Sequence, residues 1–179
     1  RFRQMHPVRG DQAQMAARTW RRGSEVTGPL RAVKDAAEVA ALRRAAEAAD
    51  RVAAQLHAGE IALVGRTEAD VSADIGRRLV AEGHQRVNFA IVASGPNAAS
   101  PHHEADERVI AAGDVVLCDF GGTMLAEGGA GYCSDITRCV VAGGAPAPAD
   151  VAEAYAVLHE AQAAAVAAAV VGTSCEAVD

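Results

Sequence analysis

Two stretches of the sequence decide the fold: residues 113–122 are GDVVLCDFGG, and residues 131–138 are GYCSDITR. The apolar run at 115–120 predicts a buried strand. The glycine-rich segment 121–131 then turns the chain, and residues 132–142 predict a returning strand. Together these segments predict an antiparallel hairpin with a long loop.

Each predicted strand carries one aspartate. Asp119 ends the apolar run, where a lone ionised carboxylate would cost several kcal/mol or stay protonated. An arginine partner, several backbone N–H donors or a metal ion could each stabilise it. A strand-end aspartate that caps the glycine turn is the alternative without a functional role.

Asp135 lies on the returning strand, and residues on facing strands come within about 5 Å of each other. Two carboxylates that close repel each other unless a cation lies between them. Arg138 could neutralise one of them, but alternation along the strand turns it to the face opposite Asp135. Hard divalent cations take oxygen ligands, so Asp119 and Asp135 predict half of a two-metal site.

Two histidines, His102 and His103, follow a predicted turn at 94–97. Beside a metal site, a loop histidine could hydrogen-bond the substrate or transfer a proton. His102 is the candidate catalytic and substrate-binding residue. His103 is the weaker substrate-binding candidate, with a surface loop histidine as the alternative. The other four histidines are interpreted as structural residues without partners: His6, His57, His84 and His159.

The rest of the chain predicts three helices, a further strand at 87–93 and a short extended piece at Val109–Ile110. The capping box of Asp35 with Glu38 starts the first helix, Thr67 with Asp70 the second, and Asp150 with Glu153 the third, which runs to about residue 171. The apolar stripe of the first helix is expected to contain Val39, Leu42, Ala46, Ala49, Ala53 and Leu56, and that of the second Val71, Ile75 and Leu79. This order of helices and strands predicts an α+β fold.

Composition bounds the function. The net charge of −6 disfavours nucleic acid as the main partner. Residues 1–33 carry a balance of +5 and residues 34–179 one of −11, which indicates a boundary near Gly28. The four cysteines form no regular framework and indicate reduced thiols in the cytoplasm. No charge-free apolar run is long enough to predict a membrane span.

These segments together resemble the pita-bread metallopeptidases, in the branch of Xaa-Pro dipeptidase (prolidase) and aminopeptidase P. The resemblance covers about four-fifths of the chain, from about Val33 to the end. It rests on three motifs in order: IVASGPNAA at 91–99 followed by PHH at 101–103, GDVVLCDFGG at 113–122, and GYCSDITR at 131–138. It implies that residues 34–179 are the N-terminal half of a pita-bread catalytic domain, with helices packed on an antiparallel sheet. Residues 1–33 would be the tail of an N-terminal domain and a linker.

The resemblance also implies a site. Asp119 and Asp135 match the first two metal ligands of the family, with Asp135 as the bridging one, and His102 matches its substrate-side histidine. Two divalent ions, manganese, cobalt or zinc, would activate a water that attacks the peptide bond before a proline at P1′. A homodimer of the full-length protein is a further implication.

Two departures from the family pattern bear on activity. The segment between the aspartates is longer than usual around 123–128, and a one-residue slip in strand pairing would turn Asp135 away from Asp119. The remaining ligands of the family, a histidine and two glutamates, have no match before Asp179. The chain therefore resembles a truncated peptidase, expected to be inactive in isolation. A creatinase-like hydrolase and a pseudo-peptidase binding module are the alternative functions.

Overall fold

The computed structural model describes residues 22–179. The chain divides into two compact units, with the boundary between Val39 and Ala40. The described part of the first unit contains helix α2 (Gly23–Ala32), and none of the residues of this helix is buried. The site residues discussed below all belong to the second unit.

The boundary predicted near Gly28 falls inside helix α2, so this segment is not an extended linker. The assignment of residues 1–33 and 34–179 to two domains stays a prediction. Residues 1–21, which include His6, lie outside the described part of the chain.

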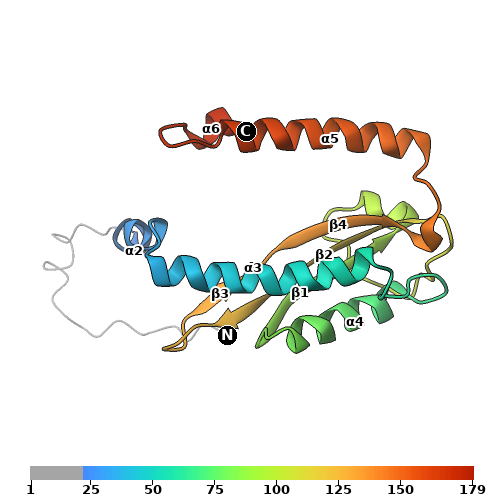
Figure 1. The fold of residues 1–179 in the computed structure, drawn as a ribbon, viewed down its shortest axis with the longest axis horizontal. Helices are drawn as coiled ribbons and strands as arrows, with labels where there is room; N and C mark the ends of the chain where they lie inside the picture. Colours follow the sequence, from blue (N-terminus) through green and yellow to red (C-terminus); the bar gives the residue numbers. More distant parts are fainter. Residues whose placement is uncertain (1–21) are drawn as a thin grey trace, which may run out of the picture. The chain divides into compact units, whose positions relative to one another are not determined.

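After α2 the chain follows the predicted order of helix, helix, strand, hairpin and helix (Figure 1), except that the extended piece predicted at Val109–Ile110 is only an isolated bridge between Val109 and Thr67. Its elements are α3 (Ala36–His57), α4 (Glu68–Ala81), β1 (Arg86–Ser94), the 3-10 helix η1 (Gly95–Ala99), β2 (Val115–Leu125), β3 (Gly131–Cys133), β4 (Ile136–Val141), the 3-10 turn η2 (Ala142–Gly144), α5 (Ala149–Ala168) and α6 (Cys175–Val178).

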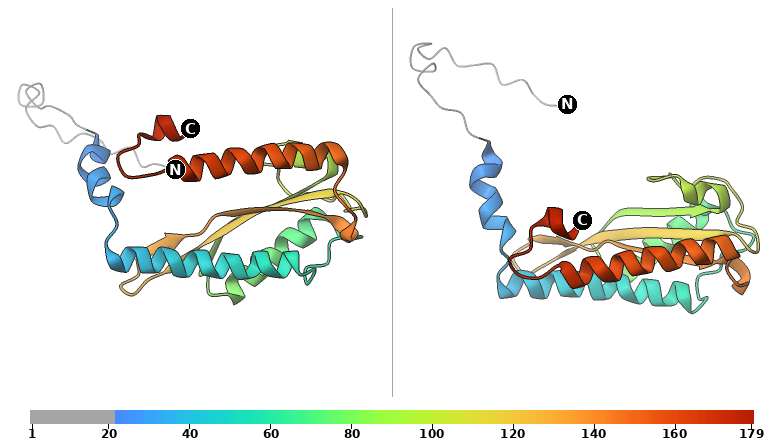
Figure 2. Two further views of the ribbon diagram at one scale, coloured as in Figure 1. Left: turned by 45° about the horizontal axis from the view of Figure 1, so that its top comes forward. Right: turned by 90° about the horizontal axis from the view of Figure 1, so that it is seen from above.

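The strands form one antiparallel sheet with β2 in the middle. β1 pairs with one edge of β2, and β3 and β4 pair in succession with the other. Helices α3 and α4 lie on one face of the sheet and α5 lies on the other side (Figure 2). The predicted α+β class is confirmed. The face of the sheet opposite to α3 and α4 is called the open face below.

The core lies between the sheet and the helices α3 and α4. Alternate residues of β2, namely Val116, Cys118 and Phe120, are fully buried there. The capping box predicted for α3 is confirmed by both of its hydrogen bonds, and the predicted start of α4 is confirmed by the bond from the Asp70 N–H to Thr67 Oγ1. Helix α4 buries its predicted stripe, which consists of Val71, Ile75 and Leu79.

The predicted stripe of α3 is partly wrong. Val39 is 44% exposed, and the buried residues are Ala41, Ala45, Ala48, Ala49, Val52, Ala53 and Leu56. Alanine occupies positions on several sides of this helix, so its spacing does not select one face. Alanine also allows close approach of the helix to the sheet, which tertiary packing then uses.

The hairpin differs from the prediction at its turn. β2 does not end at Phe120 but continues through Gly121 and Gly122 to Leu125, and the chain reverses over residues 126–130. The segment around 123–128, expected as an extra loop, therefore forms the end of β2 and the turn of the hairpin. The pairing of β2 with β3 and β4 keeps one register, whereas its pairing with β1 shifts by one residue between Val87 and Phe89.

Helix α5 begins after Pro148, so the predicted cap at Asp150 is wrong. Pro148 is the N-cap residue of α5, and its missing N–H removes one of the donors that a helix start leaves unpaired. None of the α5 residues is buried. Within residues 22–179, the structure contains no helix with the length and apolar character that a membrane crossing requires.

Candidate metal and substrate site

Asp119 and Asp135 lie on the same face of the sheet but not directly opposite each other. The residue opposite Asp119 is Thr137, so the predicted facing pair of aspartates is wrong. β3 and β4 pair with β2 in one uninterrupted register, which leaves Asp135 opposite Gly121. The two aspartates are thus a diagonal pair on the open face, where Cα atoms lie about 7–8 Å apart. No slip turns Asp135 away.

Asp119 is half-buried rather than buried, because alternation turns it away from the core. The high desolvation cost expected for it does not apply. Its carboxylate accepts a hydrogen bond from Thr137 Oγ1 at 3.0 Å. Arg138 points to the opposite face, as predicted, and lies 4.0 Å from the carboxylate of Asp50 on α3. Arginine is therefore not the partner of Asp119.

The backbone of Asp135 lies against Gly121. A Cβ atom at Gly121 would be 2.9 Å from the carbonyl carbon of Ser134 and 3.2 Å from Cα of Asp135. Both distances are shorter than ordinary Cβ contacts, so only glycine allows the strands to approach this closely. Gly121 thus helps to place Asp135.

A buried histidine supports the same part of β3 and β4. His84 is 2% exposed; its Nδ1 lies 3.1 Å from the carbonyl oxygen of Leu79 and its Nε2 lies 2.9 Å from Ser134 Oγ. A carbonyl oxygen only accepts, so in the neutral ring Nδ1 donates and Nε2 accepts from the Ser134 hydroxyl. Ser134 Oγ also accepts from the N–H of Gly122 at 3.2 Å. The prediction that His84 lacks partners is wrong.

The two loop histidines have different surroundings. His102 is exposed, and its backbone φ is +58°. His103 is half-buried, and its Nε2 lies 2.7 Å from a carboxylate oxygen of Glu68. Both line a hollow of about 340 Å³ whose other walls are Ser72, Phe89, Ala90, Ile91, Glu104 and Ala105. Ile91 is the cross-strand neighbour of Asp119, so this hollow reaches the strand beside the predicted ligands.

Glu68, at the start of α4, is the functional candidate that the sequence did not indicate. It is completely buried and accepts hydrogen bonds from the Ser94 N–H at 2.6 Å and the Ser94 hydroxyl at 2.7 Å. Asn97 Nδ2 donates to it at 3.1 Å, in addition to the contact with His103. One carboxylate thereby joins the end of β1, η1 and the histidine loop.

These contacts also set the ionisation of Glu68. Burial favours the neutral acid, but the hydrogen bonds from Ser94, His103 and Asn97 outweigh it and lower the pKa of Glu68 below its ordinary value. The carboxylate is therefore ionised at neutral pH. Because an ionised carboxylate only accepts, His103 Nε2 must carry the hydrogen of their contact.

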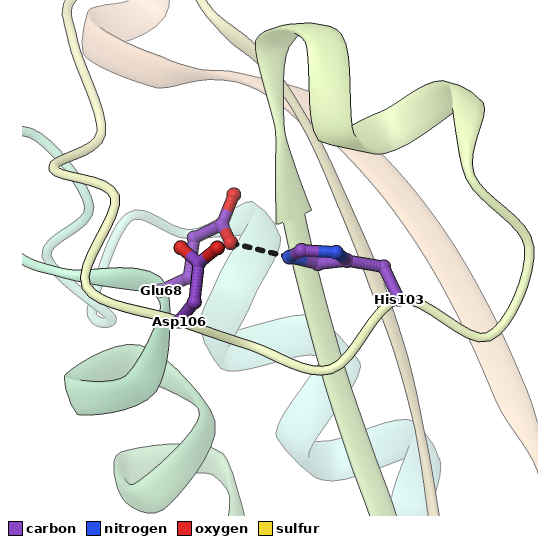
Figure 3. Close-up of side chains that lie close together, drawn as sticks. All are labelled: Glu68, His103 and Asp106. Atoms are coloured by element: carbon purple, nitrogen blue, oxygen red, sulfur yellow. Dashed lines mark hydrogen bonds and ion pairs between the residues drawn. The ribbon is translucent and has the colours of Figure 1, made fainter.

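A second set of potential ligand atoms is formed by Glu68, His103 and Asp106, which lie within 4.8 Å of one another (Figure 3). These residue types can bind a divalent cation. However, both oxygens of Glu68 already accept hydrogen bonds, and a cation would have to displace them. Asp106 Oδ1 accepts from the N–H of Arg108 at 2.7 Å. This group is better explained as the anchor of a loop.

Cys118 and Cys133, the two cysteines next to the predicted ligands, show no feature of an activated nucleophile. Burial raises the pKa of the Cys118 thiol to about 12, with a further contribution from Cys139. Cys133 is exposed, and its sulfur lies 3.6 Å from Asn88 Nδ2 and 3.6 Å from Thr123 Oγ1. Neither neighbour is a base that could activate a thiol.

The family model described as metallopeptidase family M24 matches residues 40–179. The chain belongs to this family. A protein of Mycobacterium tuberculosis named "Probable dipeptidase PepE" is 46% identical to this M24 chain over 156 residues, which are 87% of the chain and 40% of that protein. The match confirms the resemblance inferred from the three motifs.

Solved M24 structures share the fold. The dipeptidase PepE from Mycobacterium ulcerans has a TM-score of 0.72 at 48% sequence identity. The match covers 80% of this chain and 36% of that chain. The prolidase from Pyrococcus furiosus has a TM-score of 0.76 at 31% sequence identity. The match covers 88% of this chain and 44% of the prolidase chain. The chain thus spans about 40% of the length of these curated relatives and forms part of a pita-bread domain.

The donor set on the open face fits the divalent metal of an M24 peptidase. Asp119 and Asp135 present carboxylate oxygens, which hard and borderline divalent cations accept. Neither carboxylate is paired with a cation among the described residues, and Arg138 lies on the other face. The hydroxyl of Thr137 donates a hydrogen bond to one oxygen of Asp119, and the other lone pairs of the carboxylate remain available for a metal ion.

Proposed function

We propose that this chain provides the first two metal ligands and the substrate-side histidine of a metal-dependent peptidase that hydrolyses Xaa-Pro bonds. Asp119 and Asp135 would hold two divalent ions, manganese, cobalt or zinc, with Asp135 bridging them. His102 would contact the substrate. The substrate is a peptide with proline at P1′.

The observation that carries this proposal is the uninterrupted pairing of β2 with β3 and β4. It turns both carboxylates to the open face at a diagonal spacing that one or two cations can bridge. A slip by one residue would have turned one carboxylate into the core.

Each residue of the proposed site has a separate role in binding the ions or the substrate. Bound divalent ions would supply an acidified water and polarise the scissile carbonyl. Thr137 donates to one oxygen of Asp119 and thereby orients the carboxylate. Ser134 and His84 hold the backbone next to Asp135. His102, on the hollow beside β1, is placed to donate a hydrogen bond to the substrate or to move a proton.

Two aspartates provide few of the ligands that a dinuclear site needs. We therefore propose that residues 1–179 alone bind divalent ions weakly and do not hydrolyse peptides. Sequence relatives named as dipeptidases are about twice as long as this chain, so activity is to be measured on the complete gene product.

The test combines metal content with hydrolysis. The complete gene product, loaded with manganese or cobalt, is expected to cleave Xaa-Pro dipeptides. Asp119→Asn and Asp135→Asn should each lower both the metal content and kcat. Asp50→Asn is the matched control, since Asp50 is an exposed aspartate on α3 at the far face. Failure of the wild-type protein to bind metal and to cleave any Xaa-Pro bond would refute the proposal.

A further inference from the structure

His102 has a backbone conformation that residues other than glycine rarely adopt. It is the one non-glycine residue with positive φ among residues 22–179. A side chain in this left-handed region is strained, and such residues persist where their surroundings hold them. The His102 ring makes no hydrogen bond with the described part of the chain, so its neighbours must hold the backbone instead.

The neighbour that does so is His103. Its N–H donates to the carbonyl oxygen of Ser100 at 3.3 Å, and its ring contacts Glu68 at 2.7 Å. Glu68 is itself fixed from two further directions by Ser94 and Asn97. The loop is therefore attached to the buried start of α4 immediately beside His102.

A second contact limits the other end of this loop. Arg108 donates through Nε to Ser94 Oγ at 3.0 Å and through Nη2 to Asp114 Oδ2 at 3.0 Å. Ser94 thus links Glu68 to Arg108, and Arg108 links the loop to the residue that precedes β2. With both ends anchored, the contact with His103 remains the attachment nearest to His102.

We propose that Glu68 and His103 are positioning residues: the buried carboxylate holds the His103 ring, and this contact directs His102 into the hollow beside Asp119. The inference rests on the proposed function, in which His102 contacts substrate. It assigns to His103 an anchoring role in place of substrate binding. It also assigns a role to a glutamate that the sequence indicates only as a first-turn acid.

Three variants separate positioning from general stability. His103→Ala removes the ring but leaves Glu68 with its donors from Ser94 and Asn97, so the fold is expected to persist. His103→Gln places an N–H donor where Nε2 lies and should restore the contact. Asp106→Asn is the matched control: it changes a carboxylate of the same group that has no hydrogen bond to either positioning residue.

The first measurement is independent of catalysis. In 15N-edited NMR of the histidine rings without substrate, His103→Ala should shift and broaden the ring signals of His102. His103→Gln should restore much of the wild-type signal, and Asp106→Asn should leave it unchanged. Unchanged His102 signals in His103→Ala, in a protein that remains folded, would overturn the proposal.

The second measurement uses the metal-loaded complete gene product with an Xaa-Pro dipeptide. A small displacement of a catalytic group costs about 100-fold in rate, so kcat should fall by that order in His103→Ala and in Glu68→Gln. The metal content and KM should change little, because a group that acts in the transition state lowers kcat and kcat/KM together.

His103→Gln should recover to within about tenfold of the wild-type rate. If Asp106→Asn loses as much kcat as His103→Ala, or if His103→Ala, Glu68→Gln and Asp106→Asn all lower the metal content, a cation site formed by Glu68, His103 and Asp106 is indicated instead. Either result would overturn the positioning role. If the wild-type protein proves inactive, the proposed function fails, and the NMR result alone decides whether His103 positions His102.

Discussion

The substitution Gly121→Ala tests the geometry of the two aspartates most directly. The added methyl group would lie 2.9 Å from the carbonyl carbon of Ser134, where ordinary contact begins at 3.4 Å. Because the carbonyl oxygen of Ser134 would lie closer still, the two strands would have to separate by about one ångström. Overpacking of this kind costs about 1–3 kcal/mol.

The separation would also weaken two hydrogen bonds. Ser134 N–H donates to the carbonyl oxygen of Gly122 at 2.9 Å, and the Gly122 N–H donates to Ser134 Oγ at 3.2 Å. Each contributes about 1 kcal/mol. The expected loss in the free energy of unfolding is therefore about 2–4 kcal/mol.

Urea unfolding followed by circular dichroism measures this loss. With a slope of about 2 kcal/mol per molar urea, the midpoint should fall by about 1–2 M. Gly76→Ala on α4 is the matched control, because its methyl group would meet Val87 at an ordinary 3.7 Å. That variant should be stabilised by about 0.5–1 kcal/mol, since alanine favours helix. Equal stabilities for the two variants would refute the close strand approach.

Three further predictions concern buried polar groups. Because the pKa of Glu68 is lowered on folding, its contribution to stability should be complete above about pH 4.5 and lost as the pH falls through its folded pKa. Glu68→Gln should flatten this acid dependence, and an unchanged pH profile would count against it. Ser134→Ala leaves the Gly122 N–H and the His84 ring without their partner, and should lower the free energy of unfolding by about 1–3 kcal/mol in thermal or urea unfolding. Iodoacetamide followed by mass spectrometry should label exposed Cys133 in the native protein and spare Cys118, whose thiol is buried with a pKa of about 12; rapid labelling of Cys118 would show that β2 is not packed on the core.

Much of the candidate site could be proposed from the sequence. The aspartates are recognisable because Asp119 ends an apolar strand pattern and both lie in motifs that resemble those of the family. His102 is recognisable by its place after the turn. The face of each aspartate follows from alternation along a strand, but the pairing partner depends on register, and register depends on where the turn lies. Two glycines within β2 resemble a turn and moved the predicted one by several residues.

The role of Glu68 could not be predicted from local pattern. An acidic residue in the first turn of a helix is common, because it interacts favourably with the N-terminal end of the helix dipole. The partners that distinguish this one, Ser94, Asn97 and His103, follow it by 26, 29 and 35 residues. Local sequence patterns do not indicate which residues this far apart come into contact, so these hydrogen bonds could not be predicted.

The sequence by itself determined the order of helices and strands, the apolar stripe of α4 and the identity of the candidate ligands, because these depend on periodicity and residue type. Tertiary structure alone decided which face of alanine-rich α3 is buried, that Thr137 and not Asp135 lies opposite Asp119, and that Glu68 anchors the histidine loop. The physical reason is common to all three. Alanine spacing, strand register and buried hydrogen bonds each admit several local solutions, and only packing between segments distant in the chain selects one.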